Sequence, residues 1–453
     1  MRTWLPAVAV CMALVFVGPA AGQEPRPSPD TAELLRRLQL VEAELRALKL
    51  LPPEPSLNLP DLSEKQKPRY PSVNVGGVFQ ADVGWFSQST ANRLSVGDLE
   101  DGANFRRARL HAFGALAEQM DYRLQMDFAF FGRPSFTDVY FDVKQIPGLG
   151  NIRVGQWKQW VGLEEITSFR FNPFFERASI FLFNPFRRIG IGTYDWSADE
   201  KFTWQTSIFR AGQDQFGGDI GDNNGWGGTL RRTANPIYDH DGAEVLHLGV
   251  AYHPQFPTDQ RLRFGAFGGN SPEFGLFVGQ PGTASFRGTP SFVDTGVLLA
   301  NTNHLLGGEF AWVRGPFSVQ AEANVEFVDQ VREGPLWFWG GYLYATWFLT
   351  GEHRVYNRRF GSFDQIRPRA NFNPWSDGNW RGGAWELAAR LSYIDLTDGQ
   401  VQGGTLTDVT LSVNWYLNTN VRLSFNYIHA MLNRPPHGQS HADIFALRAQ
   451  VEW

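Results

Sequence analysis

In two segments of the sequence, arginines two residues apart alternate with apolar residues as they would on a half-buried strand. Arg107 and Arg109 form one pair, and Arg261 and Arg263 form the other. Side chains two residues apart on an extended strand share one face and lie about 6.6 Å apart, because the rise is about 3.3 Å per residue. A guanidinium group binds phosphate or carboxylate oxygens through two parallel N–H groups. These pairs therefore predict a row of weak contacts for an anion that moves along the strand.

Other charged residues fall on the same faces when alternation is counted from neighbouring apolar positions. Arg123, Asp138 and Arg153 are examples. Arg106 falls on the face opposite to that of Arg107 unless the strand starts late or bulges there. Acidic residues among these arginines would weaken anion binding and hold the arginines in place. The candidate residues of an anion path are Arg106, Arg107, Arg109, Arg123, Asp138, Arg261 and Arg263.

Three loop-like segments could also matter for function. The segment from Thr167 to Arg188 is rich in phenylalanine and arginine. It predicts either a constriction folded into an interior or a rim or subunit-contact loop, and the sequence leaves both open. Gly217 to Gly228 contains acidic and amide residues but fits no EF-hand spacing, which favours an exposed loop over a calcium site. Asp239 to Gly242 predicts a turn.

The sequence offers no pattern for an enzyme or a metal site. Cys11 is the single cysteine, so thiol catalysis and cysteine–zinc sites are excluded from the rest of the chain. Neither Gly-x-Ser-x-Gly nor His-Glu-x-x-His occurs, and the nine histidines are scattered. We therefore expect no catalytic activity, no metal and no cofactor.

Composition excludes two further classes. Lys+Arg is 41 and Asp+Glu is 46, which gives a net charge of −5 without any dense basic run, so nucleic acid is not an expected partner. Aromatic residues make up 14% of the chain, too many for a disordered protein. Lysine does not occur after Lys201, so later cationic groups must be arginines.

The first 72 residues divide into three segments. Residues 1–22 predict a secretory signal, because Arg2 precedes an apolar stretch from Ala7 to Val17 that is too short to span a bilayer. Residues 23–51 predict a coiled-coil helix that begins near Asp30, because leucine and valine recur with heptad spacing. An amphipathic helix lying on another surface is the alternative. Residues 52–72 are rich in proline and predict an extended linker.

Residues 73–453 alternate between apolar and polar positions. Between residues 317 and 327, for example, Phe317 and Val319 share one face while Ser318 and Gln320 share the other. Such runs last about 10 residues, the length of a tilted membrane-spanning strand. The same pattern recurs in residues 385–393, 409–415, 421–427 and 445–453.

Aromatic residues gather at the ends of these runs, as expected for the two girdles of a transmembrane barrel. Examples are Trp337 to Trp339, Trp347 to Phe348 and the final residue, Trp453. A sheet in lipid must close on itself, since an open edge would leave backbone groups unpaired. We therefore predict an all-β fold, an antiparallel transmembrane β-barrel of 16 strands (16–18 fit the length) with an aqueous lumen.

With these features the sequence resembles the phosphate-selective porin O and P family. The resemblance covers residues 73–453 and implies a 16-stranded barrel, a homotrimer, an anion-binding constriction lined by arginines and lysines, and both termini in the periplasm. The most specific stretches are Phe105 to Arg109, Val154 to Gln156 with Gly162 to Ser168, Phe348 to Glu352, Gly383 to Leu387 and Asn414 to Asn418.

The resemblance also assigns roles to individual residues. It implies that Arg106 and Arg107 are constriction arginines and that Arg123 is the next basic position. Asp138 matches the constriction aspartate of the family.

At other positions the sequence matches the family pattern only in part. Arg261 and Arg263 match two rungs of the family's arginine ladder, but the third rung is Gly265. Glu165 replaces a family lysine, and Arg109 replaces an aromatic residue that shapes phosphate preference. The resemblance thus supports the barrel more firmly than it supports phosphate selectivity.

These observations predict an outer-membrane porin for passive diffusion of small anions, phosphate or polyphosphate among them. Its partners would be inorganic anions, outer-membrane lipid and two further copies of the chain. One alternative is a general diffusion porin with little selectivity, in which facing charges such as Arg107 and Asp138 only hold the wall. Another is a structural anchor of the outer membrane that uses the amino-terminal coiled coil.

Overall fold

The computed structural model describes residues 69–129, 134–212, 225–265, 291–375 and 382–453, together with four helical residues, Arg37, Leu40, Val41 and Glu44. The chain divides into two units, residues 1–67 and 68–453. The predicted signal segment, most of the predicted coiled coil and linker, and residues 217–224 of the predicted surface loop lie outside the described residues. No helix in the described ranges is long and apolar enough to cross a bilayer.

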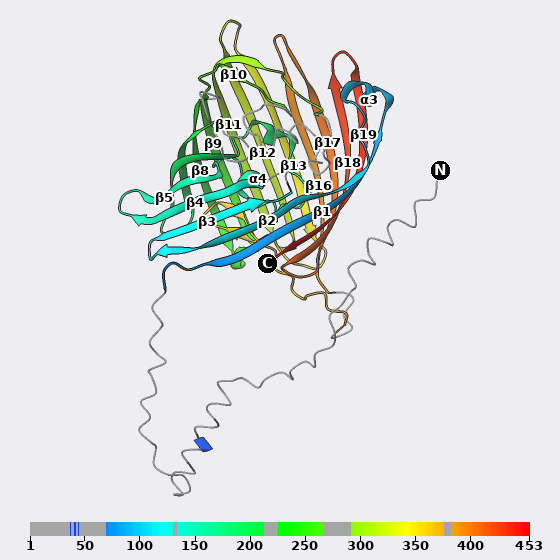
Figure 1. Cartoon of the computed structure of the whole chain (residues 1–453). Helices are drawn as coiled ribbons and strands as arrows, with labels where there is room; N and C mark the ends of the chain where they lie inside the picture. Colours follow the sequence, from blue (N-terminus) through cyan, green and yellow to red (C-terminus); the bar gives the residue numbers. More distant parts are fainter. Residues whose placement is uncertain are drawn as a thin grey trace. The chain divides into compact units, whose positions relative to one another are not determined.

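The second unit is an antiparallel barrel of 16 long strands, which confirms the predicted fold. Each strand pairs with its neighbours, and the wall closes where β1 meets β19, from Val78 opposite Glu452 to Gln88 opposite Ala442 (Figure 1). The strands are β1 Asn74–Gln88, β2 Gly102–Ala117, β3 Met120–Asp127, β4 Ser135–Ile146, β5 Gly150–Lys158, β6 Arg187–Trp196, β7 Phe202–Arg210, β8 Trp226–Asp239, β9 Glu244–Phe256, β11 Leu298–Arg314, β12 Phe317–Gln330, β13 Leu336–Phe348, β16 Ala384–Asp398, β17 Val401–Tyr416, β18 Val421–Arg434 and β19 Gly438–Glu452.

Short elements occupy the connections. A two-residue strand, β10, pairs with β11 next to the wall, and β14 pairs with β15 in a separate hairpin. The turn predicted at Asp239 to Gly242 contains the 3-10 turn η2. The bounds of these elements are α3 Thr90–Val96, α4 Leu163–Ile166, η1 Ser179–Phe183, η2 His240–Gly242, β10 Arg261–Leu262, β14 Tyr356–Asn357 and β15 Ser362–Phe363.

The predicted alternation sets the two faces of the wall. On β12, Gln320 and Glu326 are fully buried inside the barrel. Val325, which lies between them in the sequence, points outward and is 40% exposed. On β13, Trp337 and Trp347 are exposed on the outer face near the two ends of the strand. Apolar side chains therefore cover the surface that meets lipid, and polar ones line the interior.

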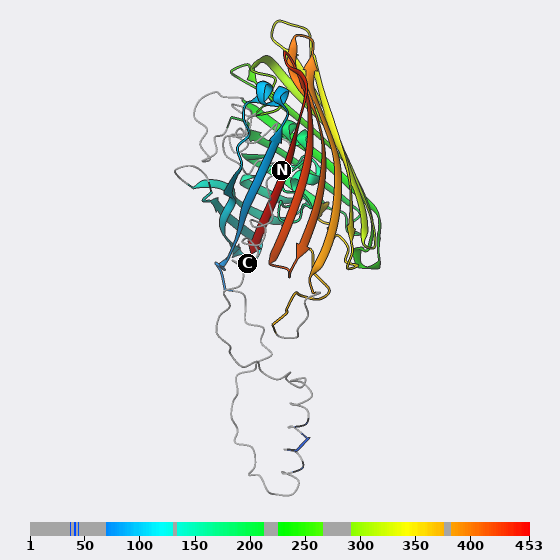
Figure 2. The same cartoon turned by 90° about the vertical axis from the view of Figure 1, so that its right-hand side faces the viewer.

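The barrel has two unlike ends, which we call terminal and distal. Both β1 and β19 reach the terminal end, where the strand β1 begins and the chain ends (Figures 1 and 2). Most terminal connections are short turns, but residues 349–383, between β13 and β16, form a long one. The distal end carries the other long connections, including residues 159–186 between β5 and β6.

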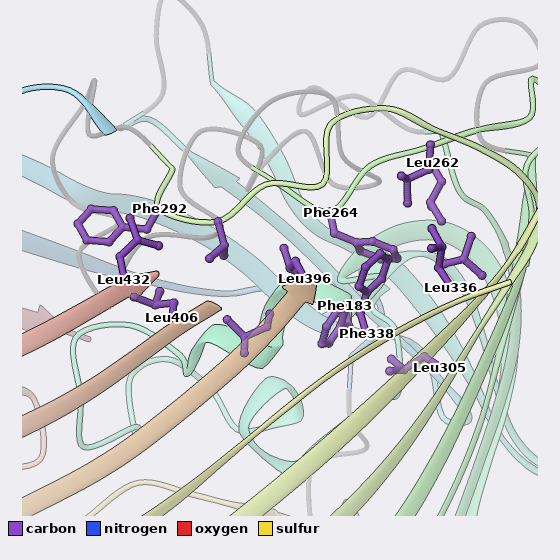
Figure 3. Close-up of a cluster of buried hydrophobic side chains, with 14 of the residues drawn as sticks. Phe183, Leu262, Phe264, Phe292, Leu305, Leu336, Phe338, Leu396, Leu406 and Leu432 are labelled. Carbon is purple, nitrogen blue, oxygen red and sulfur yellow. The ribbon is translucent and has the colours of Figure 1, made fainter. Parts of the chain in front are cut away.

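A hydrophobic cluster fills part of the interior at the distal end (Figure 3). Inward residues of the wall from β9 to β19, such as Leu305 and Leu406, supply one side of it. Connecting segments supply the other side, through residues such as Phe183, Leu262 and Phe264. We call this group the distal cluster. It occupies the β9–β19 side of the lumen and leaves the side formed by β2 to β8 to the polar residues described next.

Candidate functional site

The loop of residues 159–186 lies inside the barrel. Its short helix α4 is held by Glu322 of β12, whose carboxylate accepts hydrogen bonds from the backbone N–H groups of Leu163 (2.9 Å) and Glu164 (2.6 Å). Gly162 makes this approach possible: its φ is 76°, and a Cβ there would lie 2.6 Å from the Glu322 carboxylate. Of the two predicted placements of the Thr167 to Arg188 segment, the structure therefore has the constriction inside the lumen.

Glu176 fixes the middle of this loop to the wall. Arg106 binds its carboxylate through two hydrogen bonds (2.8 and 3.1 Å), and Arg107 adds a third at 3.3 Å. Arg448 of β19 reaches the same carboxylate at 3.2 Å while it also binds Asp82. Burial acts to raise the pKa of Glu176, but the three guanidinium groups outweigh it and hold the pKa well below its ordinary value.

A β-bulge places both Arg106 and Arg107 inside the barrel. On β1, Gln80 pairs with Arg107 but the next residue, Ala81, pairs with Phe105, so Arg106 is the extra residue of β2. This was the condition under which the sequence allowed Arg106 to face the lumen. Both arginines therefore donate to the carboxylate of the loop, and Arg107 also donates to Gln80 of the wall at 2.7 Å.

Arg109 faces the interior, as predicted, and forms a buried ion pair with Asp127 of β3 (2.7 Å). The ring of Phe169, on the constriction loop, covers both this arginine and its neighbour. Its centroid lies 4.3 Å from the guanidinium carbon of Arg107 and 5.0 Å from that of Arg109. Such contacts orient the two cations and shield one face of each from the lumen.

Asp138 and Arg123 also face the interior, but Asp138 is not bound to Arg107, the partner considered from the sequence. Asp138 accepts two hydrogen bonds from Arg187 of β6 (2.9 and 3.1 Å), so the pairing of Arg107 with Asp138 does not occur. Arg123 is half-buried, and its guanidinium forms no hydrogen bond or ion pair with the residues that the structure describes.

Lys158 and Arg177 bind carbonyl groups at the C-terminal end of α4. The ammonium group of Lys158 donates to the carbonyl groups of Glu165, Ile166 and Thr167, the last two at 3.0 and 3.2 Å. Arg177 donates to the carbonyl of Glu165 at 3.2 Å. The Glu165 side chain is 1% exposed, and its burial raises its pKa to about 7 although Arg177 and Lys158 oppose the rise.

A second loop enters the lumen from the terminal end. In residues 349–383, Tyr356 donates or accepts a 2.6 Å hydrogen bond with Nδ1 of His247, and the carbonyl of Gly361 accepts one from Arg231 at 2.8 Å. Arg231 is also bound to Glu309 at 2.8 and 2.6 Å, and all these side chains are buried. Buried polar and charged residues of β8, β9 and β11 thus hold the second loop in place.

The two loops and the wall line a polar cavity of about 230 Å³ on the β3–β5 side of the lumen. Of the candidate residues, Arg123 and Asp138 line it, together with Lys158, whereas the arginines of β2 do not. Among the described residues, no group of three or more histidine, cysteine or acidic side chains is arranged to hold a metal ion.

The predicted ladder of Arg261 and Arg263 does not line the lumen. Arginines that faced the lumen would turn their neighbours Leu262 and Phe264 toward lipid, but both of these side chains are buried in the distal cluster (Figure 3). Arg261 is exposed, and Arg263 is bound to Asp294. The prediction is wrong because β10 contains only two residues and lies in a loop that folds over the barrel, so its apolar side chains pack inward.

Sequence reasoning also missed several residues of the site. Glu176 is the single acidic residue between Thr167 and Arg188, and this contrast was a usable signal. Lys158, Arg231 and Glu309 had no comparable signal, because their partners are distant in the sequence and meet them only when the barrel closes.

Comparisons with known proteins agree with this architecture. The family model described as "Phosphate-selective porin O and P" matches residues 73–453. Porin O of Pseudomonas aeruginosa is 27% identical over 407 residues, which cover 84% of this chain and 88% of that protein. A protein of Caulobacter vibrioides with no assigned function is 27% identical over 398 residues, covering 83% and 73% of the two chains.

Solved structures with the same fold include OmpT, an outer-membrane protein of Vibrio cholerae. Its variant lacking loop L8 has a TM-score of 0.51 and 11% identity, and the match covers 84% of this chain and 99% of that one. A trimer form of OmpT has a TM-score of 0.50 at the same identity, covering 84% and 99%. Because the family model matches the whole barrel, and the barrel closes with 16 strands around a charged interior, the chain belongs to the phosphate-selective porin O and P family and is a porin of the outer membrane.

Proposed function

We propose that anions cross this porin along the β2–β6 side of the lumen and that Arg123 is the main cation they meet. The carrying observation is that Arg123 opens onto the lumen cavity without a partner among the described residues. Arg106, Arg107 and Arg109 are bound to carboxylates, which reduces their attraction for a passing anion. Their proposed role is to hold the constriction and to add a modest positive potential.

The experiment is a reversal-potential measurement on the purified porin in planar bilayers that separate two KCl concentrations. We expect a potential of the sign given by chloride passing faster than potassium. A potential of the opposite sign, or one near zero, would contradict the proposal.

The paired arginines favour general diffusion of small anions over a tight phosphate site. Glu165 stands where the family has a lysine, and the ladder arginines Arg261 and Arg263 lie away from the lumen. We therefore propose that phosphate is one permeant anion among others. Inorganic phosphate added to KCl should reduce the chloride current only at concentrations comparable with that of chloride; block at far lower concentrations would instead indicate a phosphate site.

We further propose that the porin is a homotrimer and that residues 23–51 form a three-stranded coiled coil in the periplasm. Support for the trimer comes from the family resemblance and from the trimer form of OmpT, and support for the coiled coil comes from the heptad spacing alone. Removal of residues 23–51 should lower the temperature at which the trimer dissociates in detergent.

A further inference from the structure

The lumen cavity combines one available cation with aromatic walls. Six of its lining side chains are aromatic, and they come from three parts of the molecule. Tyr140 and Trp157 belong to the wall, Phe171 belongs to the constriction loop, and Phe360 and Phe363 belong to the second loop. An inorganic anion gains little from such walls, because its oxygens require hydrogen-bond donors on every side.

Among the cations that line the cavity, one guanidinium group is placed to bind an anion. Arg153 lines the cavity, but it is bound to Asp142 at 2.8 and 2.7 Å and stacks on Tyr140, with 3.8 Å from its guanidinium carbon to the ring centroid. Lys158 donates to loop carbonyl groups. Arg123 is the lining cation without such a partner in the described part of the chain. Its guanidinium suits a carboxylate, which accepts two parallel hydrogen bonds.

Acidic residues limit the charge that the cavity tolerates. Asp138 and Asp364 both line it, and Asp138 is already satisfied by Arg187. A second negative charge on the ligand would meet these carboxylates rather than another free cation. An aromatic ligand with a single carboxylate fits the cavity better than a doubly charged anion does. Its ring can stack against aromatic side chains such as Phe171 while its carboxylate reaches Arg123.

We propose that this cavity binds small aromatic monocarboxylates and that the porin therefore passes them in preference to aliphatic or inorganic anions of the same charge. The inference rests on the proposed anion path and adds the class of solute. Binding must be weak enough for release, because a site in a channel that holds its solute tightly blocks it.

Benzoate is the probe, and it is compared with acetate and inorganic phosphate as inhibitors of the chloride current through the reconstituted full-length porin. We expect benzoate to halve the current at a concentration about tenfold lower than acetate, the ratio that corresponds to about 1.4 kcal/mol. Equal inhibition by benzoate and acetate would show that the ring adds nothing, and would overturn the inference.

Two phenylalanines of the constriction loop provide matched variants. Phe171→Ala removes a ring from the cavity and should erase most of the difference between benzoate and acetate. Phe181→Ala removes a ring of equal size from η1, where it packs on Phe186 outside the cavity, and should keep the difference. If both variants or neither lose it, the cavity is not the site.

The same recordings separate this inference from the proposed function. Preserved anion preference in a KCl gradient with no advantage for benzoate would overturn only the aromatic site. Absence of anion preference would overturn the proposed anion path, whatever benzoate does.

Discussion

At the scale of single residues, most charges inside the barrel neutralise one another. Arg109 is bound to Asp127, and Arg187 is bound to Asp138 at 2.9 and 3.1 Å. Such pairs are buried, so removing one partner would leave an uncompensated charge and destabilise the protein. Arg123 differs because it lines the lumen cavity without such a partner among the described residues. Its charge can therefore act on ions in transit.

We predict that Arg123→Gln lowers the ratio of chloride to potassium permeability by a factor of about 3, as expected for one charge that acts through a largely aqueous medium. Arg232→Gln is the matched control, since Arg232 is exposed on the outer face of β8 together with Leu230. Reversal potentials in a KCl gradient measure both ratios. An unchanged ratio in Arg123→Gln would mean that this arginine belongs to the wall and not to the path.

The buried carboxyl group of Glu165 predicts a pH dependence of stability. Burial raises its pKa from 4.5 to about 7, so the folded protein favours the protonated form. The corresponding stabilisation is complete below about pH 4.5 and is lost as the pH rises through 7. It amounts to about 3 kcal/mol, because one pKa unit is about 1.4 kcal/mol.

We therefore expect the thermal unfolding midpoint of the detergent-solubilised porin to fall between pH 5 and pH 8, and we expect Glu165→Gln to make this fall smaller. Circular dichroism at the two pH values is the measurement. A fall of the same size in the wild-type protein and the variant would assign the pH dependence to other groups.

At the scale of elements, the constriction depends on contacts between a loop and distant strands. Glu176 binds arginines of β2 and β19, and Glu322 of β12 binds the start of α4. Residues far apart in the sequence make these contacts, so the loop can adopt its position only after the barrel has closed. Its position is a property of the whole wall and not of the loop sequence.

Glu176→Gln should loosen this loop, because it leaves Arg106, Arg107 and Arg448 without their shared carboxylate. We expect a lower unfolding temperature, corresponding to about 3 kcal/mol or more, and a noisier single-channel current. Glu118→Gln, in the exposed turn between β2 and β3, is the control. If the two variants behave alike in both measurements, Glu176 does not hold the constriction.

The strands could be predicted from the sequence, whereas the interior could be predicted only in part. Alternation identified β12, β16, β17, β18 and β19 because lipid on one side and polar groups on the other leave a period of two in the residues themselves. Arg106 needed a bulge whose existence alternation alone cannot decide, and the structure has that bulge. The ladder prediction for Arg261 and Arg263 failed because the same period occurs in a loop that packs inward.

At the scale of the whole molecule, the wall is uneven around the barrel. β3 has 8 residues and β5 has 9, whereas β11 has 17 and β17 has 16 (Figure 1). On this side of the barrel, β3 and its neighbour β4 carry exposed apolar side chains on their outer face, among them Leu124 and Phe141. A low apolar wall is suited to contact with another subunit as well as with lipid, which supports the proposed trimer.

The proposed homotrimer predicts that each insertion into a planar bilayer closes in three equal conductance steps at high voltage. The physical reason is that three separate lumens insert together and close one at a time. Chemical cross-linking in mild detergent should give a product of three times the mass of one chain. Single-step closure together with a cross-linked product no larger than two chains would contradict the trimer.

The distal cluster has a consequence for selectivity. Electrostatic attraction in salt solution fades within about 10 Å. An ion that passed along the β9–β19 side of the lumen would therefore hardly be attracted by Arg123. Leucine and phenylalanine side chains of the distal cluster fill that side at the distal end of the barrel, where they exclude ions. On the proposed path, these uncharged side chains therefore keep a passing anion within the range of the Arg123 charge.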